Sequence, residues 1–402
     1  MDARSIGANI TALRKKHGMT QLALAERLGV TDKAVSRWEN GQGYPDISLF
    51  PRLADIFGVT IDFLMLGDKK GIAIAGNIVL DIVKNITEFP KAGMITHISK
   101  TEPYAVGGCV SNVSIDLRRI DPSLPITVYG RVGTDEYGRY IISVLQREGI
   151  NTDKIVFSKE KPTSYSDVMS VPSGERTFFH EKGSNMEFCP EDIDVDKLWC
   201  DIFHIGYLLL LDVFDAKDKE YGTKMARFLS TLQRAGIKTS IDMVSDVSMR
   251  YGEIVIPALR YADYVIINEI ECATAWNLSP RHPDGTLDED NIILAMKKCI
   301  DAGVGERVIV HAKERAYIMN RRKEYTSVNS LKIPKEDIKG SVGAGDAFCA
   351  GCLYALYNGY SDKEVLEFAS LSAACNLFGA DSISGMRSRN EILQLAQQYE
   401  RL

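Results

Sequence analysis

Residues 340–348 read Gly-Ser-Val-Gly-Ala-Gly-Asp-Ala-Phe, a run of small residues that leads directly into Asp346. Apolar residues then recur at helical spacing (Phe348, Cys352, Leu356), which predicts a buried helix that begins at a tight turn. The unpaired N–H groups and the dipole of such a helix start attract anions. Asp346 is placed to take a proton from a hydroxyl that attacks a bound phosphate. The same residues also fit an ordinary glycine-rich turn with an aspartate cap, so the rest of the chain has to decide.

The totals describe an ordinary globular protein. The chain has 402 residues, 45% hydrophobic and 25% charged, and this length allows two or three domains. A net charge of −6 gives no overall basic field for nucleic acid. Because no segment resembles a signal peptide and no apolar run reaches membrane-spanning length, we expect a cytoplasmic protein with no membrane partner.

The eight cysteines are dispersed among core-like segments, as expected in a reducing compartment. Cys349 and Cys352 form a C-x-x-C pair without a second pair elsewhere in the chain. They lie on the predicted buried helix, so we expect core packing rather than metal or redox use.

Residues 1–66 predict five short helices. The second, residues 21–28, has Thr20 as N-cap and Gly29 at the left-handed position after its end. Thr31 or Asp32 caps the third, residues 33–40. Two short helices joined at a glycine predict helix-turn-helix geometry, in which the second helix enters the major groove of DNA.

Residues 20–46 (TQLALAERLGVTDKAVSRWENGQGYPD) closely resemble the lambda-repressor/Cro-like (XRE) helix-turn-helix family. The resemblance implies binding to double-stranded DNA, with Gln21 at a phosphate. It implies four groove-facing residues, which are Asp32, Lys33, Ser36 and Arg37. The weak net charge of this block predicts modest affinity per copy, so we expect a homodimer on a two-part site. The alternative is a helical module that docks a protein partner.

Residues 67–70 predict a minimal linker, which gives a DNA-binding domain over 1–67 and a second domain over 71–402. In the second domain, short apolar runs alternate with helical patterns. The runs cover residues 72–83, 125–133, 201–211, 238–244, 263–270 and 307–312. This alternation predicts an α/β fold with a doubly wound, mostly parallel sheet, whose sites lie beyond the carboxyl ends of the strands.

Polar clusters follow several of these strand ends. Asp81 closes the segment 76–81, Asn112 closes a Gly-Gly-x-x-x-Asn run that opens a helix, and Asn268 and Glu271 follow the run 263–267. Each cluster alone has an ordinary structural explanation. In this order and spacing they resemble the ribokinase-like (PfkB-type) sugar kinases from about residue 71 to 392, and the most specific element is Gly-Ala-Gly-Asp-Ala-Phe.

The resemblance implies transfer of the γ-phosphoryl group of ATP to a sugar or nucleoside hydroxyl, with ATP and Mg²⁺ as cofactors and a small lid of strands over the sugar. It assigns Asp346 as the base. It implies an anion hole from the N–H groups of Gly343, Ala344 and Gly345. It implies a sugar-binding set, which is Asp81, Gly107, Gly108 and Asn112. The resemblance assigns Asn268 and Glu271 to the end of the site that binds magnesium and phosphate. It also implies a nucleotide-binding set, which includes Lys313, Ser370, Asn376 and Gly379.

Two departures from the family pattern matter. Residues 340–342 are Gly-Ser-Val where relatives often carry Asp-Thr-Thr, and that Asp is tied to monovalent-cation binding, so potassium dependence stays open. Residues 311–316 read His-Ala-Lys-Glu-Arg-Ala and lose both glycines of the usual Thr-Leu-Gly-x-x-Gly. Lys313 in this stretch either meets a phosphate or is simply exposed.

We therefore expect a sugar kinase fused to its own DNA-binding domain, which regulates transcription. The alternative is a sugar-sensing transcriptional regulator with a catalytically weak or inactive kinase fold. The altered segment 313–316 favours this alternative, but the retained Asp346 speaks against it. The sequence identifies neither the sugar nor the operator.

Overall fold

The computed structural model describes residues 3–66, 70–173, 175–244 and 250–402. The chain divides into two compact units, residues 1–71 with 199–201 and residues 72–198 with 202–402. Residues 67–69 of the predicted linker lie outside the described residues, so the predicted domain boundary stays a prediction. Among the described residues, none of the helices has the length and apolar character needed to cross a membrane.

The first unit is helical; its second helix begins and ends at the predicted residues, and its third begins and ends one residue before them. The elements are α1 (Ala3–Lys16), α2 (Gln21–Leu28), α3 (Asp32–Glu39), the 3₁₀ turn η1 (Ile47–Leu49), α4 (Phe50–Phe57) and α5 (Ile61–Leu66). Thr20 and Thr31 cap α2 and α3 by accepting backbone N–H bonds, and Gly29 is left-handed with φ of 73°. Apolar residues one helical turn apart then meet in one core, which includes Ile10, Leu24, Leu28, Val35, Trp38 and Leu53.

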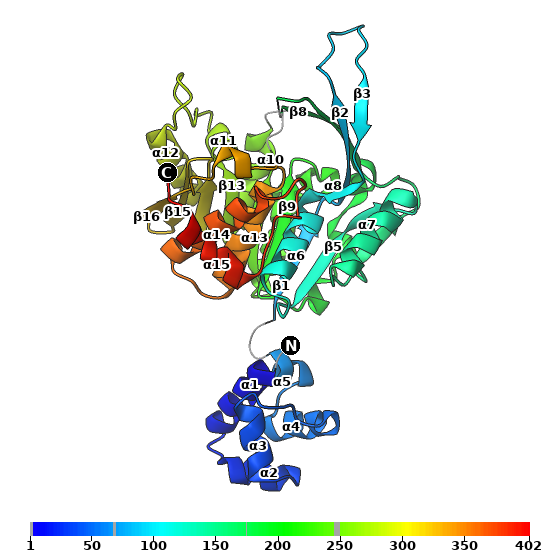
Figure 1. Cartoon of the computed structure of the whole chain (residues 1–402). Coiled ribbons are helices and arrows are strands. Elements are labelled where there is room, and N and C mark those ends of the chain that lie inside the picture. The colour runs from blue at the N-terminus through cyan, green and yellow to red at the C-terminus, as the bar shows by residue number, and fades with distance from the viewer. Residues whose placement is uncertain (1–2, 67–69, 174, 245–249) are drawn as a thin grey trace. The chain divides into compact units, whose positions relative to one another are not determined.

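The second unit is built on a nine-stranded sheet in the order β16-β15-β14-β13-β12-β9-β1-β5-β6 (Figure 1). The strands are β1 (Ile72–Gly76), β5 (Ile126–Gly133), β6 (Ile155–Ser158), β9 (Ile202–Leu208), β12 (Lys238–Met243), β13 (Tyr264–Asn268), β14 (Arg307–His311), β15 (Arg315–Asn320) and β16 (Tyr325–Asn329). All neighbours pair in parallel except at β15, which is antiparallel to both β14 and β16. The predicted doubly wound, mostly parallel α/β sheet is confirmed.

Helices cover both faces of this sheet. They are needed there because the side chains of each strand alternate between the two faces and are buried on both. They are α6 (Gly108–Ile120), α7 (Glu136–Arg147), α8 (Asp212–Asp215), α9 (Lys224–Arg234), α10 (Tyr251–Leu259), α11 (Glu269–Thr274), α12 (Glu289–Ala302), α13 (Ala344–Tyr357), α14 (Asp362–Asn376) and α15 (Arg389–Gln398). Ile202 of β9 shares a core with residues of α6, α13 and α14, whereas the adjacent Phe203 packs edge-on against Phe228 of α9.

The topology places a switch point between β1 and β9. From β1 the chain proceeds to β5 and β6, then returns to β9 on the other side of β1 and continues outward to β12. The strand ends at this point are Gly76 and Gly206, which face each other in register. A Cβ on Gly76 would lie 2.5 Å from the carbonyl oxygen of Gly206. In open parallel sheets such a switch point leaves a crevice beyond the strand ends.

A second, smaller sheet forms the predicted lid and extends from the central sheet (Figure 1). Its strands are β2 (Val79–Ile86), β3 (Ile98–Thr101), β4 (Ala105–Gly107), β7 (Tyr165–Ser170) and β8 (Arg176–Glu181). The single apolar run predicted over residues 72–83 is thus two strands in different sheets, β1 and the start of β2. The residues between them, Asn77 and Ile78, carry the chain from one sheet to the other.

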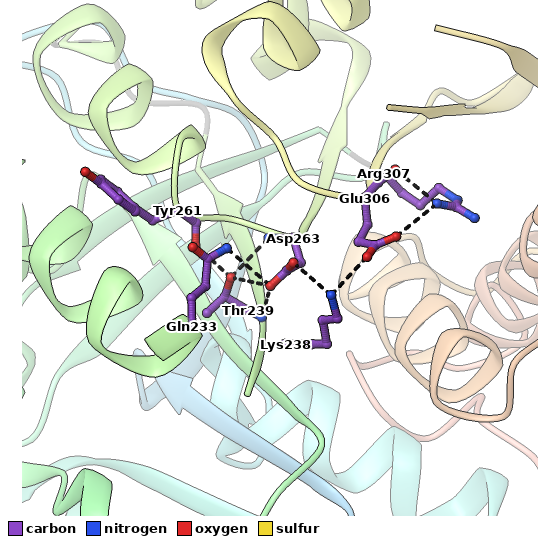
Figure 2. A network of polar contacts seen from close by, with 7 residues as sticks. All are labelled: Gln233, Lys238, Thr239, Tyr261, Asp263, Glu306 and Arg307. Atoms are coloured by element: carbon purple, nitrogen blue, oxygen red, sulfur yellow. Dashed lines mark hydrogen bonds and ion pairs between the residues drawn. The ribbon is translucent and has the colours of Figure 1, made fainter. Parts of the chain in front are cut away.

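At the opposite ends of the strands, the buried carboxylate of Asp263 ties β12, β13 and α9 together (Figure 2). It accepts hydrogen bonds from the N–H of Thr239 at 2.9 Å, from Lys238 Nζ at 3.2 Å and from Gln233 at 3.4 Å. These contacts lie at the amino ends of the strands, away from the switch-point crevice. These hydrogen bonds hold β12 and β13 in register with each other.

Candidate active site

The turn before α13 is built around Gly343. It has φ of 82°, and a Cβ there would lie 2.5 Å from the carbonyl oxygen of Ser382, so glycine is required. Ala344 N–H bonds a carbonyl inside the turn, so this member of the predicted anion hole is engaged. In the described part of the chain, the N–H groups of Gly345 and Asp346 have no acceptor. Two unpaired N–H groups at the positive end of a helix make an anion site.

Asp346 is buried in the first turn of α13, with 8% of its surface exposed. Asn112 Nδ2 donates to its Oδ2 at 2.8 Å, and the hydroxyl of Tyr207 donates to both carboxylate oxygens at 3.1 and 3.2 Å. Burial raises the pKa of Asp346 to about 6, with a further rise from the Asp242 carboxylate, while the bonds from Asn112 and Tyr207 oppose the rise. The carboxylate is therefore ionised at neutral pH but basic enough to accept a proton.

Asn112 is held in its orientation by a second contact. The Ser382 hydroxyl donates to Asn112 Oδ1 at 2.9 Å, which leaves the NH₂ group to face Asp346. Ser382 also contacts Gly343. One side chain thus links the sugar-side helix α6 to the anion turn.

Asp81, on β2, packs against the glycines that open α6. A Cβ on Gly107 would lie 2.5 Å from Asp81 Oδ2, and Gly108 has φ of 82°. Burial raises the pKa of Asp81 to about 6, and the nearby Arg176 works against that rise. Asp81, Arg176 and Ser382 line a cavity of about 620 Å³ under the lid, which has room for a sugar.

A second cavity, of about 270 Å³, lies in front of the anion turn. It gathers Gly343, Gly345 and Asp346 with residues at the ends of four strands, which are Tyr207, Asp242, Asn268, Glu271 and His311. The structure therefore brings the predicted base, the predicted anion turn and the predicted magnesium residues into one cavity.

Asn268 and Glu271 form the N-terminal capping box of α11. Glu271 N–H donates to Asn268 Oδ1 at 2.8 Å, and Asn268 N–H donates to Glu271 Oε2 at 3.0 Å. The box fixes both side chains at the cavity. Carboxylate and amide oxygens are ligands that Mg²⁺ prefers, so the donor set fits this ion.

Sequence reasoning missed three polar residues of this cavity, Tyr207, Asp242 and His311. Tyr207 is the next-to-last residue of β9, and its hydroxyl contacts Asp346. His311 ends β14, where its ring packs on Phe348 with centroids 4.8 Å apart. Burial lowers the pKa of His311 to about 4, so the ring is neutral at pH 7. All three lie at strand ends, which is the signal that would have found them.

The four residues predicted on the nucleotide side lie in the turn between β14 and β15, in α14 and in the loop after α14. Lys313 is exposed in the turn between β14 and β15, and Ser370 is buried in α14. Asn376 is fully buried, and its amide donates to the carbonyl of Val342 at 2.6 Å, so it braces the anion turn from behind. A Cβ on Gly379 would lie 2.5 Å from a backbone nitrogen of its own loop. Contact of these four residues with the nucleotide stays a prediction.

In the helical unit, the predicted groove-facing side chains of Asp32, Lys33 and Arg37 on α3 are exposed. The side chain of Ser36 is half-buried. Gln21 Nε2 donates to Glu39 Oε2 at 2.7 Å, and Glu39 also pairs with Arg14 at 2.6 Å. This network joins α1, α2 and α3. The Gln21 side chain therefore has a structural role in this network in addition to its predicted contact with a phosphate.

Comparison with known proteins agrees with this geometry. The family model described as pfkB family carbohydrate kinase matches residues 69–388, and a helix-turn-helix model matches residues 10–64. A 5-dehydro-2-deoxygluconokinase of Geobacillus kaustophilus is 23% identical over 311 residues, which is 73% of this chain and 85% of the relative. A ribokinase of Arabidopsis thaliana is 25% identical over 327 residues, 81% of this chain and 80% of the relative.

Solved structures show the same fold. Ribokinase from Thermotoga maritima superimposes with a TM-score of 0.66 at 20% identity and covers 81% of this chain and 99% of its own. Arabidopsis thaliana ribokinase complexed with ribose and ATP gives a TM-score of 0.66 at 22% identity and covers 81% of this chain and 98% of its own.

Proposed function

Because the chain belongs to the pfkB family of carbohydrate kinases, we propose that it transfers the γ-phosphoryl group of ATP to a hydroxyl of a sugar or related small molecule, with Asp346 as the base. The observation that carries this proposal is the shared cavity. There, the buried carboxylate of Asp346 lies beside unpaired N–H groups and beside the oxygen donors Asn268 and Glu271.

The residues of this chain supply position and charge, which is most of what phosphoryl transfer needs. Asp346 accepts the proton of the acceptor hydroxyl as it attacks. The N–H groups of Gly345 and Asp346 stabilise the negative charge on the migrating phosphoryl group. Because Asn112 and Tyr207 bond the ionised carboxylate, they keep Asp346 in its basic form.

The acceptor side is the cavity under the lid, where Asp81 accepts hydrogen bonds from sugar hydroxyls. On the phosphate side of the site, Asn268 and Glu271 are the residues that would hold Mg²⁺. When bound, this ion would neutralise negative charge on the phosphates. The neutral ring of His311 adds no charge to this end of the site.

The test is ADP release by the full-length protein over sugars, sugar acids, sugar phosphates and nucleosides. The names of the relatives place 5-dehydro-2-deoxygluconate and ribose first in the panel. We expect turnover with one acceptor class, lowered about 10²–10⁴-fold in Asp346→Asn. The control is Asp301→Asn, an exposed carboxylate. Equal turnover by Asp346→Asn would remove it as the base. No turnover together with saturable binding would favour the sugar-sensing regulator.

We also propose that the helical domain binds double-stranded DNA through α3 and regulates transcription. The support is the match to a helix-turn-helix model together with the exposed basic side chains Lys33 and Arg37 on α3. Selection from random duplexes at fixed salt should enrich one sequence. Arg37→Ala should weaken its binding, whereas Arg321→Ala, an exposed arginine of the kinase domain, should not. If no duplex is enriched, the domain docks a protein partner instead.

A homodimer is the third part of the proposal. Phe178 and Phe179 are adjacent on β8, so they point to opposite faces of the lid. Phe178 lines the sugar cavity, and Phe179 is 58% exposed on the other face. An exposed apolar lid face suits a second copy of the chain. Light scattering should give a dimer mass for the wild type and a monomer mass for Phe179→Glu, and a wild-type monomer would exclude this interface.

A further inference from the structure

Four buried side chains with metal-binding atoms meet close to Asp346, each from a different element. They are Cys109 on α6, His204 on β9, Asp242 on β12 and Cys349 on α13. Exposed fractions are 0% for Cys109 and His204, 8% for Asp242 and 2% for Cys349. Within the described residues, Cys352, the other half of the C-x-x-C pair, forms no hydrogen bond with this cluster, so the pair in sequence is not the pair in space.

Two spacings between donor atoms match the edges of a tetrahedral ion. His204 Nε2 lies 3.3 Å from Asp242 Oδ2 and 3.6 Å from Cys349 Sγ. Zinc bonded at about 2.0–2.3 Å to nitrogen, oxygen and sulfur has tetrahedral edges of about 3.3 Å for N–O and about 3.6 Å for N–S. The ligand atoms of Cys109, His204 and Asp242 all lie within 4.8 Å of one another. Cys349 stands outside this set of three, and because its Sγ already lies beside His204 Nε2, a small shift would bring it in as the fourth ligand.

The imidazole and the carboxylate are both oriented from outside the cluster. His204 Nδ1 lies 3.0 Å from the Ser240 hydroxyl, which turns Nε2 toward the other donors. Asp242 Oδ1 accepts the N–H of Tyr207, which leaves Oδ2 to face His204. Metal-binding histidines and carboxylates are usually held by such outer contacts.

Two buried carboxylates also lie at the cluster. Asp242 and Asp346 are both buried, and within residues 3–66, 70–173, 175–244 and 250–402 neither carboxylate pairs with a lysine or arginine. A divalent ion would neutralise this charge.

We propose that Cys109, His204, Asp242 and Cys349 form a binding site for Zn²⁺, separate from the magnesium residues Asn268 and Glu271. Thiolate and imidazole donors select zinc over magnesium. Asp242 and Cys349 also line the cavity in front of Asp346, which gives the ion a way in. The ion braces the active site, because Cys109 and Cys349 each lie three residues from Asn112 and Asp346 on the same two helices.

The first test is metal analysis of the full-length protein after expression with zinc and gel filtration in metal-free buffer. We expect about one zinc per chain. Cys109→Ser and Cys349→Ser should each lose most of it. Cys375→Ser, a buried cysteine on α14 outside the cluster, should keep it. Full zinc retention by both cluster variants would place the metal elsewhere and overturn the site.

A second measurement uses the wild-type chain alone, so it does not depend on whether the variants fold. Titration of the metal-stripped protein with Co²⁺ should give the absorption of tetrahedral cobalt–thiolate, saturate at about one equivalent and raise Tm. Addition of Zn²⁺ should remove the absorption, whereas Mg²⁺ should not. No cobalt–thiolate absorption, or absorption unchanged in Cys109→Ser, would overturn the proposal whether or not the chain is an active kinase.

Discussion

The hydroxyl of Tyr207 lies 3.1 and 3.2 Å from the two carboxylate oxygens of Asp346, although 139 residues separate them in the chain. Tyr207 has φ of 64°, a left-handed conformation that costs energy for any residue but glycine. Its N–H donates to Asp242, which holds the backbone in that conformation at the end of β9. The tertiary structure thus holds Tyr207 in a strained backbone conformation. That conformation positions its phenol against the carboxylate of Asp346, the proposed base.

Loss of this phenol should change the pH profile of the kinase. In Tyr207→Phe the carboxylate loses a hydrogen bond that favours its ionised form, so the pKa of Asp346 should rise further above 6. We expect the acid limb of kcat/KM to move up by about one pH unit, since a hydrogen bond to a charged group contributes about 1.5 kcal/mol. Tyr325→Phe, on exposed β16, is the control, and coincident profiles would show that Tyr207 only packs.

The wild-type acid limb should report two carboxylates. Asp81 and Asp346 each have a pKa raised to about 6, and each must be ionised for its proposed role. As pH falls below 6 both become protonated, so kcat/KM should approach a hundredfold loss per pH unit, with a plateau above 7. Asp81→Asn should lower kcat/KM and reduce the limb to tenfold per unit. An unchanged limb would mean that Asp81 does not titrate with activity.

Gly343 should tolerate no side chain. Gly343→Ala adds a Cβ 2.5 Å from Ser382 O, which displaces the anion turn from Asp346. We expect kcat to fall about 10²-fold or more, because misplacement by about 1 Å has that effect. Gly359→Ala is a matched control, since Gly359 also has positive φ, 71°, but nothing within 4 Å of the added atom. Equal kcat losses in the two variants would show that backbone strain alone is responsible.

Asp263 should matter for stability and not for catalysis. Asp263→Ala breaks the network of Figure 2, and we expect a loss of about 1–3 kcal/mol in the free energy of unfolding, because the buried N–H of Thr239 loses its acceptor while Lys238 reaches solvent. KM should not change, because the network lies at the amino ends of the strands. Asp301→Ala, which removes an exposed ion pair with Lys323, should cost about 0–1 kcal/mol. Urea unfolding of both variants, with KM measured alongside, checks this prediction.

The sequence by itself determined the local structure, because its causes are local. Thr20 and Gly29 bound α2 at the predicted residues, since a cap needs only its own neighbours. In the same way, the small residues before Asp346 made the turn that opens α13, and the order of apolar runs gave the α/β fold, whereas the lid was expected from the family resemblance. Polar residues at predicted strand ends and helix starts marked Asp81, Asn112, Asn268 and Glu271, although Asp81 lies inside β2.

Only the tertiary structure decided which strand ends meet. Tyr207, Asp242 and His311 become neighbours of Asp346 because β9, β12 and β14 are ordered around the switch point, and no local pattern encodes that order. The same reason explains Asn376, which the family resemblance assigns to the nucleotide side and which the packing of α14 buries against Val342. It also explains Cys349, whose partners in the proposed zinc site come from three other elements rather than from its own C-x-x-C pair.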